Sequence, residues 1–119
     1  MDLQALLARE AIRDLVARYN IDGDAGRFDK QIDLFTEDGW IEIPGARRYE
    51  GRERLRELFT GAVGHDDSGS APQRIAHHVS SLAIDLDPAD PSAATGSCYY
   101  AVLTGEGLDH WGRYKDVYR

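Results

Sequence analysis

Apolar residues in the N-terminal segment follow the spacing of an amphipathic helix. They recur every three or four residues between residues 2 and 21, at Leu3, Leu6, Leu7, Ile12, Leu15, Val16 and Tyr19. Asp2 is a suitable N-cap residue, and Gly23 and Gly26 are expected to end the helix. The pattern therefore predicts a first helix over residues 2–21.

The middle of the chain is predicted to hold two further helices, a strand and a loop. A helix is predicted over residues 27–36 and a strand over residues 39–43. A third helix is predicted to begin at Gly51, and a loop is predicted over residues 64–72. Pro44 and Gly45 favour a turn directly after the strand. The loop is rich in polar residues, which makes it a candidate lid.

From residue 74 onward the hydrophobic period changes to the two-residue period of strands. Three strands are predicted, over residues 74–87, 93–104 and 109–119. The segments that separate them contain Pro and Gly and suit antiparallel hairpins. Helices followed by a run of strands predict one α+β domain over residues 1–119, with its helices packed on one face of a curved sheet.

Strand alternation assigns side chains of the first of these strands to two faces. Leu82, Ile84 and Leu86 share one parity and are expected to face the core. In a strand without a bulge, His78 takes that same face and His77 takes the opposite one. Two histidines on opposite faces cannot bind one metal ion, so no metal site is predicted here.

The two later strands carry aromatic and polar side chains on both faces. Cys98, Tyr100 and Val102 share one face, and the pattern leaves open whether that face points inward. In the last strand Tyr114 and Asp116 lie on one face. A sheet with a pocket on one face and a subunit contact on the other fits this pattern, so we expect a homodimer formed through the sheet.

Composition and charge exclude several classes of function. With 119 residues the chain is expected to form one domain, and its net charge of −7 argues against nucleic acid and anionic membranes as partners. The single cysteine, Cys98, excludes an internal disulfide and fits a cytoplasmic location. No run of the sequence approaches the roughly 20 apolar residues of a membrane span.

The end of the first helix places two polar groups beside the predicted core. Tyr19 lies on the apolar stripe of the helix, and Asp24 lies in the Gly-rich turn that is expected to follow. Ordinary core packing requires neither a phenol nor a carboxylate at this point. Together with a histidine these groups would form an acid–base site, so both are candidate functional residues.

Several short motifs occur in an order that is typical of one protein family. They are Arg18-Tyr19 with Asp24, LFTEDG at residues 34–39, YEGRE at residues 49–53, HHVSS at residues 77–81 and GRYKD at residues 112–116. On these motifs the chain resembles the SnoaL-like group of the nuclear transport factor 2-like superfamily, and within it scytalone dehydratase and bile-acid dehydratase. The resemblance implies a cone-shaped α+β barrel and chemistry that needs no cofactor.

The resemblance also implies a reaction and a set of site residues. The reaction is elimination or isomerisation next to a carbonyl group of a small hydrophobic molecule of the alicyclic, polyketide or steroid type. His78 would accept a proton, Asp24 would hold the imidazole, and Tyr19 would donate a hydrogen bond to the substrate oxygen. Further candidates for substrate contacts are Tyr100, Tyr114, Cys98 and Trp40.

Three departures from the family pattern keep a second interpretation open. Ile43 stands where steroid isomerases of the family carry a carboxylate, and Cys98 stands where scytalone dehydratase has a second histidine. Members of the family usually have a final strand with a Gly-x-Trp motif, and this sequence does not contain it there. We therefore expect either that the chain lacks a C-terminal strand or that it closes its sheet differently. The alternative is a non-catalytic domain of the same fold that binds a small molecule or forms a dimer.

Overall fold

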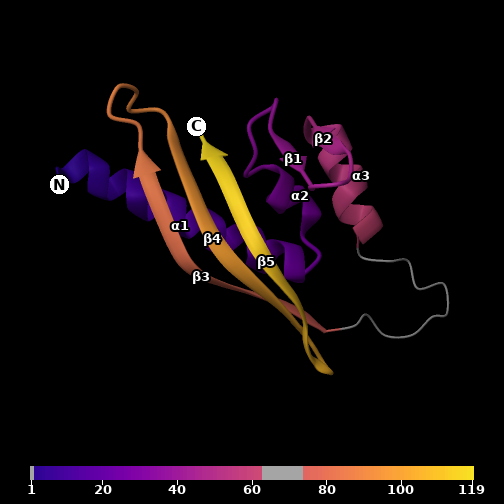
Figure 1. The fold of residues 1–119 in the computed structure, drawn as a ribbon. Coiled ribbons are helices and arrows are strands. Elements are labelled where there is room, and N and C mark those ends of the chain that lie inside the picture. The colour runs from indigo at the N-terminus through magenta and orange to yellow at the C-terminus, as the bar shows by residue number, and fades with distance from the viewer. Residues whose placement is uncertain (1, 63–73) are drawn as a thin grey trace. The chain divides into compact units, whose positions relative to one another are not determined.

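The computed structural model of the protein describes residues 2–62 and 74–119 (Figure 1). The loop predicted over residues 64–72 lies outside the described residues. The chain divides into two compact units. We call them the sheet unit, which holds residues 2–21 and 74–119, and the hairpin unit, which holds residues 22–62.

The sheet unit consists of one long helix and a three-stranded antiparallel sheet. Its elements are α1 (Leu3–Asp24, whose last residues belong to the hairpin unit), β3 (Ile75–Leu86), β4 (Ala94–Thr104) and β5 (Gly107–Tyr118). The strands pair in the order β3-β4-β5, and α1 crosses one face of this sheet (Figure 1). Val16, Ile84 and Val102 are buried between the helix and the strands. The three predicted strands and their antiparallel hairpins are therefore confirmed.

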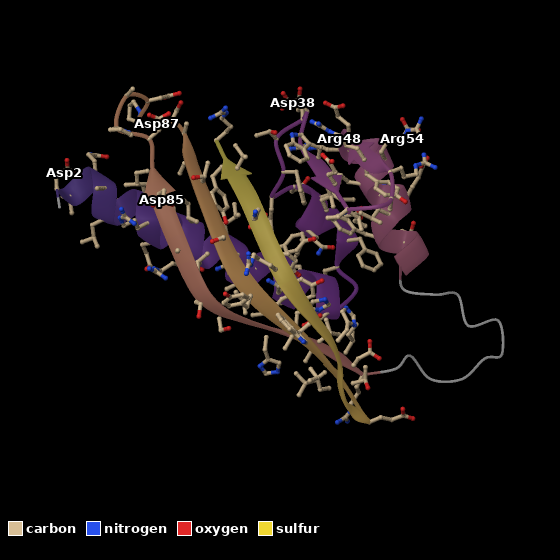
Figure 2. All side chains as sticks on the ribbon, in the orientation of Figure 1. Asp2, Asp38, Arg48, Arg54, Asp85 and Asp87 are labelled. Carbon is tan, nitrogen blue, oxygen red and sulfur yellow. The ribbon has the colours of Figure 1, made fainter. Side chains whose placement is uncertain are left out.

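The hairpin unit packs two helices and a short hairpin around an aromatic core. Its elements are α2 (Phe28–Ile32), β1 (Trp40–Glu42), β2 (Arg48–Glu50) and α3 (Arg52–Ala62). The Phe59 ring lies 6.4 Å from the ring of Phe28 and 6.1 Å from that of Phe35, measured between centroids. Arg56 pairs with Asp29 and so links α3 to α2. In both units charged side chains lie at the surface, as Asp38, Arg54 and Asp85 do in Figure 2.

The α+β class is confirmed, but several predicted bounds are wrong. Helix α1 continues through Gly23 to Asp24, so Gly23 does not end it. A side chain at this position would meet the Gln31 amide at 2.5 Å, which accounts for a glycine inside the helix. Helix α2 has only five residues, and β2 was not predicted. Within the described residues the strands form two separate sheets and do not close into one barrel.

A β-bulge in β3 decides which side chains reach the helix-covered face of the sheet. The register with β4 shifts between Ser80 and Ala83, and Ser81 adopts a positive φ of 54°. Before the bulge, His77 pairs with Val102. After it, Ile84 pairs with Gly96, and residues 96 and 102 share one face of β4. His77 therefore lies on the same face as Ile84.

The predicted face of His78 is wrong for this reason. His78 pairs with Ala101 and is exposed on the opposite face, whereas His77 is half-buried. The extra residue of the bulge reverses the parity of every residue that precedes it in the strand. The prediction that the two histidines occupy opposite faces is confirmed; the faces themselves are interchanged.

Replacing Ser81 with glycine is expected to stabilise the protein by about 0.5–1 kcal/mol, because a non-glycine residue at positive φ is strained and glycine is not. The free energy of unfolding in urea measures the change. Ser80→Gly is the matched control, since Ser80 lies in regular strand and the substitution should destabilise by about 0.5–1 kcal/mol. Equal destabilisation by both substitutions would contradict a strained backbone at Ser81.

Candidate active site

The two faces of the three-stranded sheet differ in their surroundings. We call the face covered by α1 the inner face and the opposite face the outer face. The Tyr114 hydroxyl donates a long hydrogen bond of 3.4 Å to Asn20 Oδ1 of α1, and the Arg9 guanidinium donates one of 2.7 Å to the carbonyl of Ile84. These contacts fix α1 against the inner face at β5 and at β3.

A row of aromatic rings runs along the inner face. The His77 ring lies 6.4 Å from the ring of Tyr100, which stacks on Tyr114 at 4.5 Å, all between centroids. The Tyr114 ring in turn meets the Tyr19 ring edge-on at 6.3 Å. Gly112 opposite Tyr100 makes room for this row, because a Cβ there would lie 2.5 Å from the Tyr100 hydroxyl. The structure thus brings three predicted site residues together with a histidine that was assigned to the other face.

Three tyrosines of the inner face, Tyr19, Tyr114 and Tyr118, stay protonated. Burial raises the pKa of Tyr19, and the negative charge of Asp116 raises it further. Burial also raises the pKa values of Tyr114 and Tyr118, with a further contribution from Asp116 in each case. A phenol with a raised pKa keeps its hydrogen across the physiological range, so these side chains are hydrogen-bond donors rather than bases.

Burial raises the pKa values of two acidic groups of the inner face, Asp116 and Cys98. Burial raises the pKa of Asp116, and the hydrogen bond that it accepts from Tyr118, 3.2 Å long, opposes this shift. Burial likewise raises the pKa of the Cys98 thiol, which is 2 % exposed and pairs with Tyr114 across the strands. Cys98 therefore lines the inner face as a neutral group.

Three predicted site residues lie elsewhere in the structure. His78 is exposed on the outer face, as described above. Trp40 belongs to β1 of the hairpin unit, where the Arg48 guanidinium lies 4.0 Å from its ring centroid. Asp24 is the half-buried last residue of α1 and also belongs to the hairpin unit. The roles of Asp24 and Trp40 stay predictions.

Sequence reasoning missed three residues of the inner face, namely His77, Asn20 and Asp116. A signal for His77 was present, because Val79 and Leu82 are three residues apart whereas Leu82, Ile84 and Leu86 alternate. Such a spacing indicates one extra residue in a strand. Asn20 is buried and also bonds to the Val16 carbonyl of its own helix at 3.0 Å. Nothing in the sequence distinguished it from an exposed helical asparagine.

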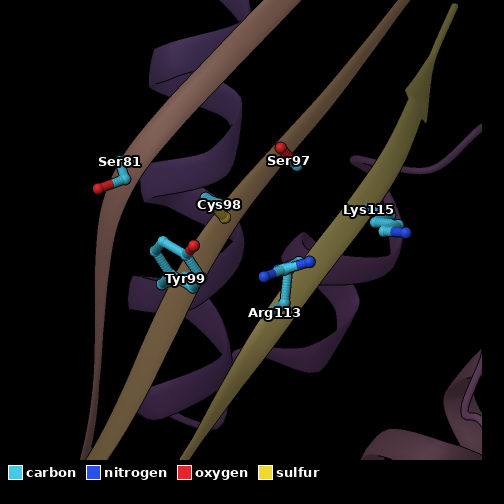
Figure 3. A pocket seen from close by; sticks show the side chains of 6 residues that line it. All are labelled: Ser81, Ser97, Cys98, Tyr99, Arg113 and Lys115. Carbon is cyan, nitrogen blue, oxygen red and sulfur yellow. The ribbon is translucent and has the colours of Figure 1, made fainter.

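The outer face presents a different chemistry. A shallow depression there is lined by Ser81, Ser97, Tyr99, Arg113 and Lys115, and it also reaches Cys98, the buried residue that pairs with Tyr114 of the inner face (Figure 3). The Arg113 guanidinium lies 5.3 Å from the centroid of the Tyr99 ring. Because alternate residues of β5 point to opposite faces, Arg113 and Lys115 lie on the outer face while Asp116 lies on the inner one. The basic residues of this part of β5 are thus separated from the tyrosine row.

Comparisons with known proteins identify relatives of the whole chain. A family model of the SnoaL-like domain matches residues 4–119. A protein structure from Catenulispora acidiphila is 29 % identical, with a TM-score of 0.75, and covers 96 % of this chain and 80 % of its own. Another from the same organism, solved in complex with S-DNPA, is 30 % identical, with a TM-score of 0.71 and coverage of 95 % and 81 %.

A further solved structure has the same fold. It is a nuclear transport factor 2-like protein with a cystatin-like fold from Novosphingobium aromaticivorans, 25 % identical, with a TM-score of 0.68 and coverage of 96 % of this chain and 79 % of its own. No curated protein matches the sequence. Among the described residues, no helix combines the length and the apolar character that a membrane crossing requires. The match over residues 4–119, together with the fold, shows that the chain belongs to the SnoaL-like family.

Proposed function

We propose that the protein is a cofactor-independent lyase or isomerase that moves a proton next to a carbonyl group of a small hydrophobic molecule. The observation that carries this proposal is the inner-face row, in which a half-buried histidine shares one surface with Tyr19 and Tyr114, two tyrosines that burial keeps protonated. Imidazole ordinarily exchanges protons near neutral pH, and a neutral phenol stabilises an oxygen that gains negative charge. The row therefore combines a base with oxyanion donors.

In the proposed first step the His77 imidazole accepts the proton of the carbon next to the carbonyl. The electron pair of the broken C–H bond forms a carbon–carbon double bond, and the carbonyl oxygen becomes an enolate oxygen. The Tyr19 hydroxyl donates a hydrogen bond to this oxygen, and its raised pKa keeps the hydrogen in place. Tyr100 and Tyr114 contact the substrate beside it. The role predicted for Asp24, which the sequence analysis paired with His78, stays a prediction.

The second step decides between elimination and isomerisation. In elimination, the enolate electrons form the new double bond as a hydroxyl group leaves from the next carbon. That hydroxyl takes the proton from the His77 imidazolium and departs as water, so the histidine returns to its neutral form. In isomerisation, the imidazolium returns the proton to a different carbon. Both routes balance without an external oxidant or reductant.

The ligand is proposed to be a small hydrophobic molecule. Val79, Val102 and the neutral Cys98 separate the polar groups of the inner face and provide apolar contacts. The relative from Catenulispora acidiphila that was solved with S-DNPA, at 30 % identity, supports a small-molecule ligand. A non-catalytic binding domain is the second candidate, and Cys98 favours it, because a buried thiol with a raised pKa does not carry protons as a second histidine would.

Deuterium exchange tests the proposed proton abstraction without requiring the natural substrate. α-Tetralone, a bicyclic ketone without a leaving group, is incubated with the protein in D₂O, and mass spectrometry follows exchange of the protons next to the carbonyl. We expect exchange above the buffer rate in the wild-type protein. The derivative of α-tetralone with a hydroxyl on the β-carbon then tests elimination by the absorbance of its aromatic product. Binding of α-tetralone without exchange would exclude acid–base catalysis on this class and favour the binding domain.

A further inference from the structure

Asp116 is a carboxyl group on the inner face that forms no ion pair with any of the residues that the structure describes. It lies two residues after Tyr114 on β5, on the same face of the strand, and pairs with Gly96 of β4. Within the sheet unit as described, no lysine, arginine or histidine forms an ion pair with it. Arg113 and Lys115, its basic neighbours on β5, point to the outer face (Figure 3). A negative charge at Asp116 is therefore not neutralised within this unit.

The groups that surround Asp116 in the sheet unit are hydroxyls and a thiol. Across the elements that pack around it they are Tyr19 of α1, Cys98 of β4, and Tyr114 and Tyr118 of β5. Arg9 of α1 bonds to the Ile84 carbonyl on β3. Since β3 and β5 are separated by β4, about 10 Å lies between their backbones. Asp116 thus faces weakly acidic donors instead of a counter-ion.

Gly96 makes room for the hydrogen bond that Asp116 accepts from Tyr118. The Tyr118 ring folds over Gly96, where an added Cβ would lie 3.0 Å from the ring. In this position the Tyr118 hydroxyl reaches Asp116 Oδ2 at 3.2 Å. A carboxyl group has two oxygens, and the second one accepts or, when protonated, donates a further hydrogen bond. This oxygen is the part of Asp116 that a ligand would meet.

We infer that Asp116 is a specificity residue, which favours neutral ligands that carry a hydroxyl group and disfavours anionic ones. The inference rests on the proposed function in one respect only, that the inner face binds the ligand. A ligand hydroxyl hydrogen-bonds the carboxyl group in either protonation state. A ligand anion close to an unneutralised carboxylate is repelled, and the low dielectric of a half-buried site strengthens the repulsion.

Two naphthalene probes test this inference in binding experiments at pH 8. One is 2-naphthalenemethanol, a neutral alcohol, and the other is naphthalene-2-sulfonate, which stays ionised. We expect Asp116→Asn to shift the affinity ratio by about tenfold toward the sulfonate, chiefly by tighter sulfonate binding. Asp85→Asn is the matched control, since it removes one negative charge from an exposed position of β3 and should leave the ratio unchanged.

A pH series on the wild-type protein gives a second readout that needs no variant. Because burial raises the pKa of Asp116, lowering the pH protonates this carboxyl group and should tighten sulfonate binding while alcohol binding stays constant. An affinity ratio that does not change with pH or with Asp116→Asn would overturn the inference. Failure of both probes to bind the wild-type protein would overturn it as well. Selective binding without deuterium exchange of α-tetralone would overturn only the proposed catalysis.

Discussion

Replacing His77 with alanine is expected to lower turnover by about 10²–10⁴-fold, the range that one positioned acid or base supplies. The rings of two histidines meet Tyr100 on the inner face, His77 at 6.4 Å and His110 at 6.0 Å. His77 is the half-buried one and His110 is exposed, so the loss of His77 removes the proposed base. The measurement is kcat for loss of water from the β-hydroxy ketone, together with deuterium exchange of α-tetralone. Thermal unfolding of the variant shows whether it remains folded.

His78→Ala is the control that makes this experiment decisive. The two residues are adjacent and chemically identical, but His78 is exposed on the outer face. Turnover of His78→Ala should stay close to that of the wild-type protein. If His78→Ala were inactive and His77→Ala active, the bulge at Ser81 would not exist in the working protein and the face predicted from strict alternation would hold.

Replacing Tyr19 with phenylalanine is expected to reduce kcat by about 10²–10³-fold with little change in KM, as for the loss of one oxyanion donor. The substitution keeps the ring that meets Tyr114 edge-on and removes only the hydroxyl. Because the raised pKa keeps that hydroxyl protonated, its contribution should be a hydrogen bond that strengthens as the substrate oxygen becomes negative.

Tyr99→Phe is the matched control for the Tyr19 experiment. Tyr99 is 41 % exposed on the outer face beside Arg113, so the loss of its hydroxyl should leave kcat unchanged. A Tyr19→Phe protein with a raised KM and an unchanged kcat would show that Tyr19 binds the ground state and the transition state equally. That result would assign Tyr19 to ligand binding and favour the non-catalytic domain.

Much of the fold could be predicted because local hydrophobic periods determine it. The period of two in the C-terminal part predicted β3, β4 and β5 within two residues at each end, and α3 begins at Arg52, one residue after the predicted start at Gly51. The end of α1 could not be predicted in this way. Gly23 is a helix breaker by propensity, and its place inside the helix reflects its contact with Gln31, which is a tertiary effect.

The site was predicted in part, and the reason lies in one backbone feature. Tyr100 and Tyr114 were named as candidates from residue type, with the inward face of the β4 segment left open, and both lie on the inner face. The histidine was assigned to the wrong face because alternation was continued through residues 80–82, where the chain inserts an extra residue. Asp116 was not singled out because its importance depends on burial and on the missing counter-ion. The homodimer and the cytoplasmic location stay predictions.

The bulge at Ser81 has a consequence for comparisons among relatives. The dipeptide His77-His78 offers one imidazole to each side of the sheet, and the single residue added after it determines which one faces α1. A one-residue deletion between residues 79 and 82 would exchange the two imidazoles while the buried half of β3 stayed in register. Homologous proteins that share the dipeptide but differ in strand length would then use different members of it. Aligning the two histidines column by column would therefore not identify the residue that performs the chemistry.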